Sequence, residues 1–191
     1  MNRVTIILHE VSITPLPDLP APSPAPISWR DILKQQPEWV YRLLDHMYDD
    51  DMNHVVDQIH ASRLLFIVSD GSAKFGMMTF GWVLCTNEGS RLVKCHGSCP
   101  GRPSSLLRGE ACGMLAATLF ATILKQHLGC TFDSMFLSYQ SDNMELIKRQ
   151  QDHQSYTYPY PNTTLTAEFD LTKMIRVLHK DPTHCCQNFT M

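Results

Sequence analysis

Three acidic residues occur at points of the sequence where a carboxylate could take part in chemistry. Asp70 follows an unbroken apolar run that ends at residue 68, Asp142 follows a second apolar segment, and Glu110 lies in a long apolar stretch. Carboxylates brought together repel one another, so their pKa values rise unless a divalent cation lies between them. Ligand sets made only of oxygen suit Mg²⁺ or Mn²⁺, and pairs of such ions promote in-line displacement at phosphodiesters. A site shared by the three acids would therefore be a candidate phosphodiesterase centre.

The elements that must position these acids follow the pattern of an α/β (α+β) domain. Short apolar runs predict strands at residues 64–68, 79–85, 91–96 and 132–139. Stretches with apolar residues at helical spacing predict helices at residues 104–127, 143–151 and about 171–178. Tight turns make the first three strands an antiparallel meander, and the long helix returns the fourth strand parallel to the first. We expect a mixed sheet of strand order 3-2-1-4 with helices packed against it.

This topology predicts that the acids converge. Asp70 would end strand one and Asp142 would end strand four, so parallel neighbours place both at one edge of the sheet, where open α/β sheets bind ligands. Glu110 shares a helix face with Leu107 and Met114, and this face should press on the sheet. The alternative for Glu110 is an exposed position in the first turns of the helix, which the helix dipole favours.

The motifs around the acids resemble those of ribonuclease H domains, in the form that retrotransposons encode beside reverse transcriptase. The segments 69–72 (SDGS), 108–110 (RGE) and 141–143 (SDN) occur in the family's order and on matching elements. The resemblance covers about residues 60–180. It implies an endonuclease that hydrolyses the RNA strand of RNA–DNA hybrids with two Mg²⁺ or Mn²⁺ ions.

The resemblance also implies a role for each acid. Asp70, Glu110 and Asp142 would be both the catalytic residues and the metal ligands, and Asp70 would bridge the two ions. The partners would be the RNA–DNA hybrid and an adjacent reverse transcriptase domain.

Four residues close to the predicted metal edge are candidates for contacts to the substrate. Lys74 and Arg108 would reach phosphates, with a solvated surface charge as the alternative for each. Ser72 and Asn143 would hydrogen-bond the hybrid backbone or the ribose 2′-OH, with a turn residue and a helix cap as the respective alternatives. The net charge of -3 shows no global adaptation to nucleic acid, so any such contacts must be local.

The C-terminal part departs from the family's pattern. The family adds a fifth strand and then a fourth acid after a histidine-bearing loop, whereas here Asp181 precedes His184 and no strand is evident between them. We therefore expect the fifth strand to be missing, with strand four at an exposed edge, and we assign no fourth ligand. The alternative function is a truncated or decayed ribonuclease H-like fold without turnover, acting as an interaction or spacer module.

The N-terminal part is expected to have its own organisation. Residues 1–14 would be a lone strand or disordered, 15–28 a Pro-rich linker, and 29–60 a helical extension before the ribonuclease H-like domain at 61–191. Two helical pieces are expected between residues 29 and 48, with Pro37 opening the second.

The seven cysteines form no regular framework, and neither a signal peptide nor a membrane-spanning stretch is evident. This favours an intracellular setting, in the nucleus or cytoplasm, with free thiols. A zinc site at Cys95, His96 and Cys99 would lack a second pair of ligands at finger spacing.

Overall fold

The computed structural model describes residues 28–48, 51–62, 64–101, 105–128, 137–155, 168–180 and 188–190. The predictions for residues 1–14, for the linker up to residue 27 and for most of the loop at 152–165 lie outside these residues. The division into a linker, an extension and a domain stays a prediction. The described helices before residue 62 contribute side chains to the same hydrophobic core as the rest of the chain.

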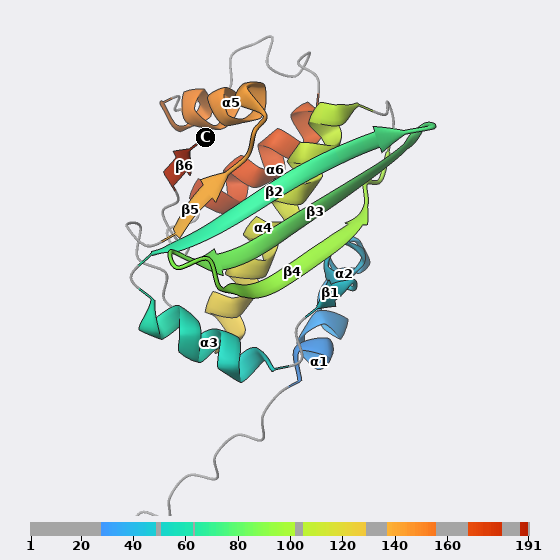
Figure 1. Cartoon of the computed structure of the whole chain (residues 1–191). Helices are drawn as coiled ribbons and strands as arrows, with labels where there is room; N and C mark the ends of the chain where they lie inside the picture. Colours follow the sequence, from blue (N-terminus) through green and yellow to red (C-terminus); the bar gives the residue numbers. More distant parts are fainter. Residues whose placement is uncertain are drawn as a thin grey trace, which may run out of the picture.

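The described part is built on one mixed sheet with the order β1-β4-β3-β2-β5-β6. Its strands are β1 (Met47–Tyr48), β2 (Leu65–Lys74), β3 (Met77–Thr86), β4 (Arg91–Ser98), β5 (Leu137–Gln140) and β6 (Asn188–Thr190). The strands β2, β3 and β4 pair antiparallel, and β5 pairs parallel with β2. The predicted fold class and the order 3-2-1-4 of the four main strands are therefore confirmed (Figure 1).

The two short edge strands correct the sequence analysis. The fifth strand expected to be missing is present as β6, which pairs parallel with β5 and covers the edge that was expected to be exposed. A strand of three residues contains no apolar run long enough to predict it. Residues 47–48, expected to end a helix, instead form β1, which pairs antiparallel with β4.

The strand that carries Asp70 is longer than its apolar run. It continues from Leu65 to Lys74, because residues 71–74 pair with the start of β3 across a turn at Phe75 and Gly76, whose φ angles are positive. Asp70 therefore lies within the strand and not at its end, which corrects the prediction. On the other side, pairing with β5 stops at Val68 and Gln140. The edge of β2 next to Asp70 is thus left without a β5 partner.

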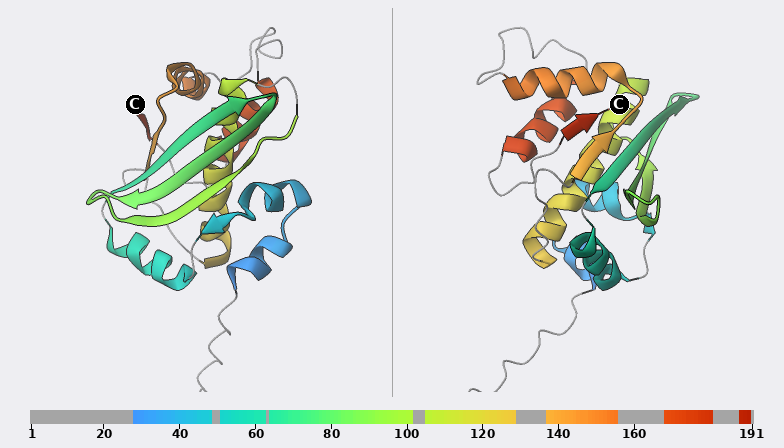
Figure 2. Two further views of the ribbon diagram at one scale, coloured as in Figure 1. Left: turned by 45° about the vertical axis from the view of Figure 1, so that its right-hand side comes forward. Right: turned by 60° about the vertical axis from the view of Figure 1, so that its left-hand side comes forward.

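Six helices accompany the sheet in the described part of the chain. They are α1 (Trp29–Lys34), α2 (Glu38–Leu44), α3 (Met52–Ala61), α4 (Leu106–Leu128), α5 (Met144–Ser155) and α6 (Phe169–Lys180). The predicted helices are confirmed with shifted ends, and Pro37 is the N-cap of α2 as expected. Figures 1 and 2 show α4 and α6 on one face of the sheet, while no helix among these six covers the opposite face of β2, β3 and β4.

The helix α4 is the centre of the core. Residues 111–124 are all buried, and the helix packs directly on β2 and β3. By length and composition alone α4 could cross a membrane, which the sequence analysis did not recognise; however, 89% of its most apolar window is buried inside the fold. Burial of this kind is typical of a core helix.

Glycine residues bring α4 unusually close to β2. A Cβ atom placed on Gly71 would lie 2.4 Å from the Glu110 amide nitrogen and 2.6 Å from the Gly109 carbonyl carbon. A Cβ atom on Gly109 would in turn lie 3.2 Å from the Gly71 Cα atom. Backbone therefore rests on backbone at this point, and no side chain larger than hydrogen fits on the strand side.

The Gly71→Ala substitution should lower the free energy of unfolding by about 1–3 kcal/mol, the usual cost of overpacking a core. The matched control is Gly81→Ala on the neighbouring strand, where the nearest atom to the new Cβ would be 3.8 Å away. Urea unfolding of the two variants should show a loss for Gly71→Ala and none for Gly81→Ala. Equal stabilities would contradict the close contact.

Candidate metal site

The three predicted acids meet at one place in the structure. Asp70 comes from β2, Glu110 from the second turn of α4, and Asp142 from the residue pair that separates β5 from the cap of α5. One carboxylate oxygen of each lies within 4.8 Å of the others. The predicted convergence is confirmed, although Asp70 reaches the site from the middle of its strand.

Strand alternation explains how the site is assembled. The side chains of Leu65, Ile67 and Ser69 are buried on the face that α4 covers, whereas Val68 and Asp70 are exposed on the other face. Because the pairing between β2 and β5 ends at Val68, no strand lies beside Asp70 on the β5 side of β2. Glu110, which is only 2% exposed, approaches from the helix side, and Asp142 follows the end of β5. The three acids thus gather where β2 and β5 part.

Glu110 is the buried member of the group and has few polar partners. The hydroxyl of Ser141 donates to its Oε2 at 3.4 Å, and the backbone N–H of Gly71 donates to its carboxylate. Burial raises the pKa of Glu110 above its ordinary value, and the negative charges of Asp142 and Asp70 raise it further, while the bonds from Gly71 and Ser141 lower it. The net direction is upward. A carboxylate crowded in this way favours either a proton or a cation.

The donor set fits a hard divalent cation. All three side chains offer oxygen, which Mg²⁺ and Mn²⁺ prefer and Zn²⁺ does not require. Within the described residues, none of the three acids forms an ion pair with a lysine, arginine or histidine. A cation would therefore relieve the repulsion among them.

The zinc alternative finds no geometric support. Cys95 and His96 are consecutive residues of β4, so their side chains point to opposite faces of the sheet. The Cys95 thiol is buried and donates to the Leu43 carbonyl, and His96 is exposed. Among the described residues, the acids are the only group of three metal-binding side chains brought together. The four described cysteines carry free thiols, as expected.

The predicted substrate contacts divide into two pairs. Ser72 and Lys74 are exposed on β2, on the same strand face as Asp70, so their proposed role stays a prediction. Asn143 caps α5, because its side-chain oxygen accepts from the Leu146 N–H at 3.1 Å. This is the alternative that the sequence analysis left open for it. The Arg108 guanidinium is hydrogen-bonded to other groups of the protein.

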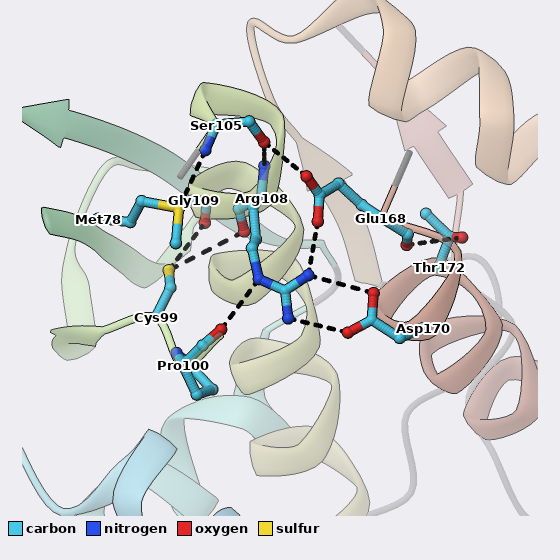
Figure 3. A network of polar contacts seen from close by, with 9 residues as sticks. All are labelled: Met78, Cys99, Pro100, Ser105, Arg108, Gly109, Glu168, Asp170 and Thr172. Carbon is cyan, nitrogen blue, oxygen red and sulfur yellow. Dashed lines mark hydrogen bonds and ion pairs between the residues drawn. The ribbon is translucent and has the colours of Figure 1, made fainter. Parts of the chain in front are cut away.

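Arg108 is the centre of an ionic network with the buried Glu168 and the exposed Asp170 (Figure 3). Its Nη1 donates to Glu168 at 2.6 Å and its Nη2 to Asp170 at 2.8 Å, while its Nε donates to the Pro100 carbonyl at 2.9 Å. The Arg108 side chain is 9% exposed and that of Glu168 is 2% exposed. Both carboxylates raise the pKa of Arg108, and the guanidinium lowers the pKa of Asp170. In this arrangement the guanidinium is occupied by partners within the protein, and the phosphate contact of Arg108 stays a prediction that would require these bonds to open.

Sequence reasoning missed Glu168, which joins α6 to the start of α4. It receives a hydrogen bond from the Ser105 hydroxyl at 2.6 Å, and the same hydroxyl oxygen accepts from the Arg108 N–H at 3.0 Å. A weak signal was available: Glu168 and Asp170 flank the start of a helix, where acids are favoured. Nothing in the sequence links them to a residue that lies 60 positions earlier.

Comparisons with known proteins give a likeness of fold and no family assignment. No protein-family model and no curated protein matches the chain. Among solved structures, it is similar to LC11 ribonuclease H1 in complex with an RNA/DNA hybrid (14% identity, TM-score 0.48, covering 66% of this chain and 83% of that one). It is also similar to a ribonuclease H1 from Halobacterium salinarum NRC-1 (15% identity, TM-score 0.41, covering 66% and 83%).

A third similar structure is the N-terminal ribonuclease H domain of a Mycobacterium tuberculosis protein, studied as a fusion with maltose-binding protein (16% identity, TM-score 0.46, covering 68% and 81%). Identities and TM-scores of this size do not establish an activity. Any functional conclusion must come from the carboxylates of this chain.

In metal-free buffer, Glu110→Gln should stabilise the protein at neutral pH. Below the ordinary carboxyl pKa of 4.5 the group is protonated in both states and the substitution should change little. As the pH rises from there through the raised pKa of the folded state, the unfolded chain loses its proton first, so the wild type loses stability and the variant does not. Urea unfolding between pH 4 and pH 8 in EDTA measures the difference.

The control for this experiment is Glu88→Gln, in the exposed turn between β3 and β4. A gain of stability for Glu110→Gln that does not vary with pH would contradict burial of the charge as its cause.

The Arg108→Ala substitution should lower the free energy of unfolding by about 3–5 kcal/mol, because it leaves the buried Glu168 carboxylate without its cation. The double variant Arg108→Met with Glu168→Leu should recover most of this loss, since it removes both charges. Lys34→Ala, which breaks an exposed pair with Asp31, is the control and should cost about 0–1 kcal/mol. An Arg108→Ala protein of unchanged stability would contradict the structural role of this network.

Proposed function

We propose that this chain is a metal-dependent endonuclease of the ribonuclease H type that hydrolyses the RNA strand of RNA–DNA hybrids. The observation that carries the proposal is the convergence of Asp70, Glu110 and Asp142 within 4.8 Å. These residues are 40 and 32 positions apart in the sequence. The order of the sequence motifs and the predicted topology alone place them at one site.

The three acids have distinct environments that suit a metal centre. Asp70 and Asp142 are exposed and face the side from which a substrate can approach, whereas Glu110 is buried behind them. Asp70, Glu110 and Asp142 would hold Mg²⁺ or Mn²⁺, as two ions. When bound, such ions activate the attacking water and stabilise the departing 3′ oxygen. The chain itself contributes position: the contact between α4 and β2 holds Glu110, and β5 and the α5 cap hold Asp142.

The hybrid substrate follows from the motif resemblance and not from the geometry alone. Exposed Ser72 and Lys74 extend from Asp70 along β2 and are the residues that we propose for contacts to the hybrid backbone. The resemblance also suggests a neighbouring reverse transcriptase domain as the source of the hybrid.

A second candidate function is the same fold without turnover, acting as an interaction module. One observation favours it: among the described residues, only three acids gather at the site, and no fourth carboxylate joins them. Fewer ligands weaken the hold on a second ion, and hydrolysis depends on both ions.

Hydrolysis of a labelled hybrid separates the two functions. Purified protein should cleave 5′-labelled RNA paired with DNA when Mg²⁺ or Mn²⁺ is present, and EDTA should abolish the cleavage. Asp70→Asn and Asp142→Asn should each reduce the rate at least about 100-fold, a scale typical of losing one electrostatic contact in a catalytic site. Asp57→Asn, at an exposed position of α3, should cleave as the wild type does.

Two results would decide against the nuclease. Equal cleavage by the wild type and by Asp70→Asn would assign the activity to a contaminant. A folded wild-type protein that cleaves no hybrid with either metal would favour the interaction module.

A further inference from the structure

The uncovered face of the sheet has a groove that begins at the candidate metal site. It is open to solvent, its volume is about 560 Å³, and its floor consists of residues from β2, β3 and β4. Two rows of paired residues cross this floor. One runs from Asp70 over Gly81 to His96, and the other from Val68 over Val83 to Lys94.

The strand β1 extends the second row and closes the far end of the groove. Tyr48 pairs with Lys94 and is 54% exposed, so its ring stands on the same face as Asp70. The Lys94 ammonium lies 5.2 Å from the centre of the Tyr48 ring. The His96 ring packs edge-to-face against Tyr48, with 5.4 Å between ring centres. The far end therefore combines two exposed rings and a cation.

Gly81 keeps the path between the two ends open. It lies between Asp70 and His96 in the first row and has no side chain to rise above the sheet. The distance from β2 to β1 is three strand spacings, about 14 Å, which corresponds to about four stacked nucleotides of one strand. A strand held at the metal site could thus reach Tyr48 without obstruction from the floor.

The charge of the groove suits a nucleic-acid strand. Among the described residues that line it, Asp70 and Lys94 are the only aspartate, glutamate, lysine or arginine side chains. Where Asp70 is occupied as a metal ligand, the remaining charge is the positive charge of Lys94. Exposed aromatic rings beside a cation on an antiparallel sheet are a common platform for unpaired bases, which stack on the rings while the cation contacts the phosphates.

We propose that this groove binds unpaired nucleotides that flank the scissile phosphate, with a base on Tyr48 or His96 and a phosphate on Lys94. The inference rests on the proposed function, because the metal site sets where the strand enters. It assigns a role to the N-terminal extension, since Tyr48 belongs to it. It also implies that an overhang on one side of the cleavage site contributes to binding, because the groove leaves the metal site in one direction.

Fluorescence anisotropy in Ca²⁺, a hard cation that oxygen ligands bind, tests the inference with the three acids neutralised, and intact RNA recovered after the measurement shows that binding was read without hydrolysis. Three labelled probes are compared: a blunt RNA–DNA hybrid, and the same hybrid with a four-nucleotide overhang on either the 5′ or the 3′ side of the RNA. We expect one overhang to tighten binding about tenfold, consistent with stacking of a single base. Tyr48→Ala and Lys94→Ala should each remove this gain, while Tyr48→Phe, which keeps the ring, should retain it.

The matched controls are His60→Ala on α3 and Lys34→Ala on α1, which change exposed residues that do not line the groove. They should leave the overhang gain within twofold of the wild type. The melting temperature of Tyr48→Ala, compared with that of the wild type, checks that the variant keeps its fold. If the melting temperature falls, the result with Lys94→Ala alone tests the groove.

The outcomes distinguish this inference from the proposed function. An overhang gain that the Ala variants remove supports the groove even when no hydrolysis occurs with Mg²⁺ or Mn²⁺. If the blunt hybrid is hydrolysed but neither overhang tightens binding, the proposed nuclease function is supported and the proposed binding of unpaired nucleotides in the groove is rejected. A gain that persists in both Ala variants, or no binding of any probe, would also overturn it and leave a protein segment as the alternative occupant.

Discussion

The contact between the backbones of Gly71 and Gly109 is the constraint on which the candidate site depends. It sets α4 against β2 so closely that a single methyl group has no room, with 2.4 Å between the virtual Cβ of Gly71 and the Glu110 nitrogen. Glu110 is the next residue on the helix, so its position follows directly from this contact. A helix held one methyl group further away would move the buried carboxylate away from Asp70 and Asp142.

Two charged residues near the start of α4, Arg108 and Glu110, have opposite environments. Arg108 is surrounded by partners, with Glu168, Asp170 and the Pro100 carbonyl all bonded to its guanidinium. Glu110 is more deeply buried and has no cation among the described residues. An unpaired buried carboxylate destabilises a fold, so packing alone does not explain why Glu110 is buried at this position. The Arg108 network supports the start of the helix that carries it, and a divalent cation would supply the missing charge.

The sequence was sufficient for the convergence of the acids and insufficient for much of the detail. Parallel pairing of two apolar runs places Asp70 and Asp142 together, and helical spacing turns Glu110 toward them. The continuation of β2 to Lys74 was not predictable from residues 71–74, because its cause is pairing with β3 and not local apolar character. The network around Arg108 was not predictable for a similar reason, since its carboxylate partners lie about 60 residues away. Strands of two or three residues carry too little pattern to predict.

The alternation of one strand links the buried half of the molecule to its uncovered face. On β2, Ser69 and Gly71 face α4, while Val68, Asp70 and Ser72 face outward. The same ten residues therefore hold the helix that delivers Glu110 and form the floor on which a substrate would lie. A shift of one residue in the register of β2 would exchange the two sets and destroy both features at once. The long pairing with β3, which extends well past Asp70, is what prevents such a shift, and it explains why this strand continues beyond its apolar run.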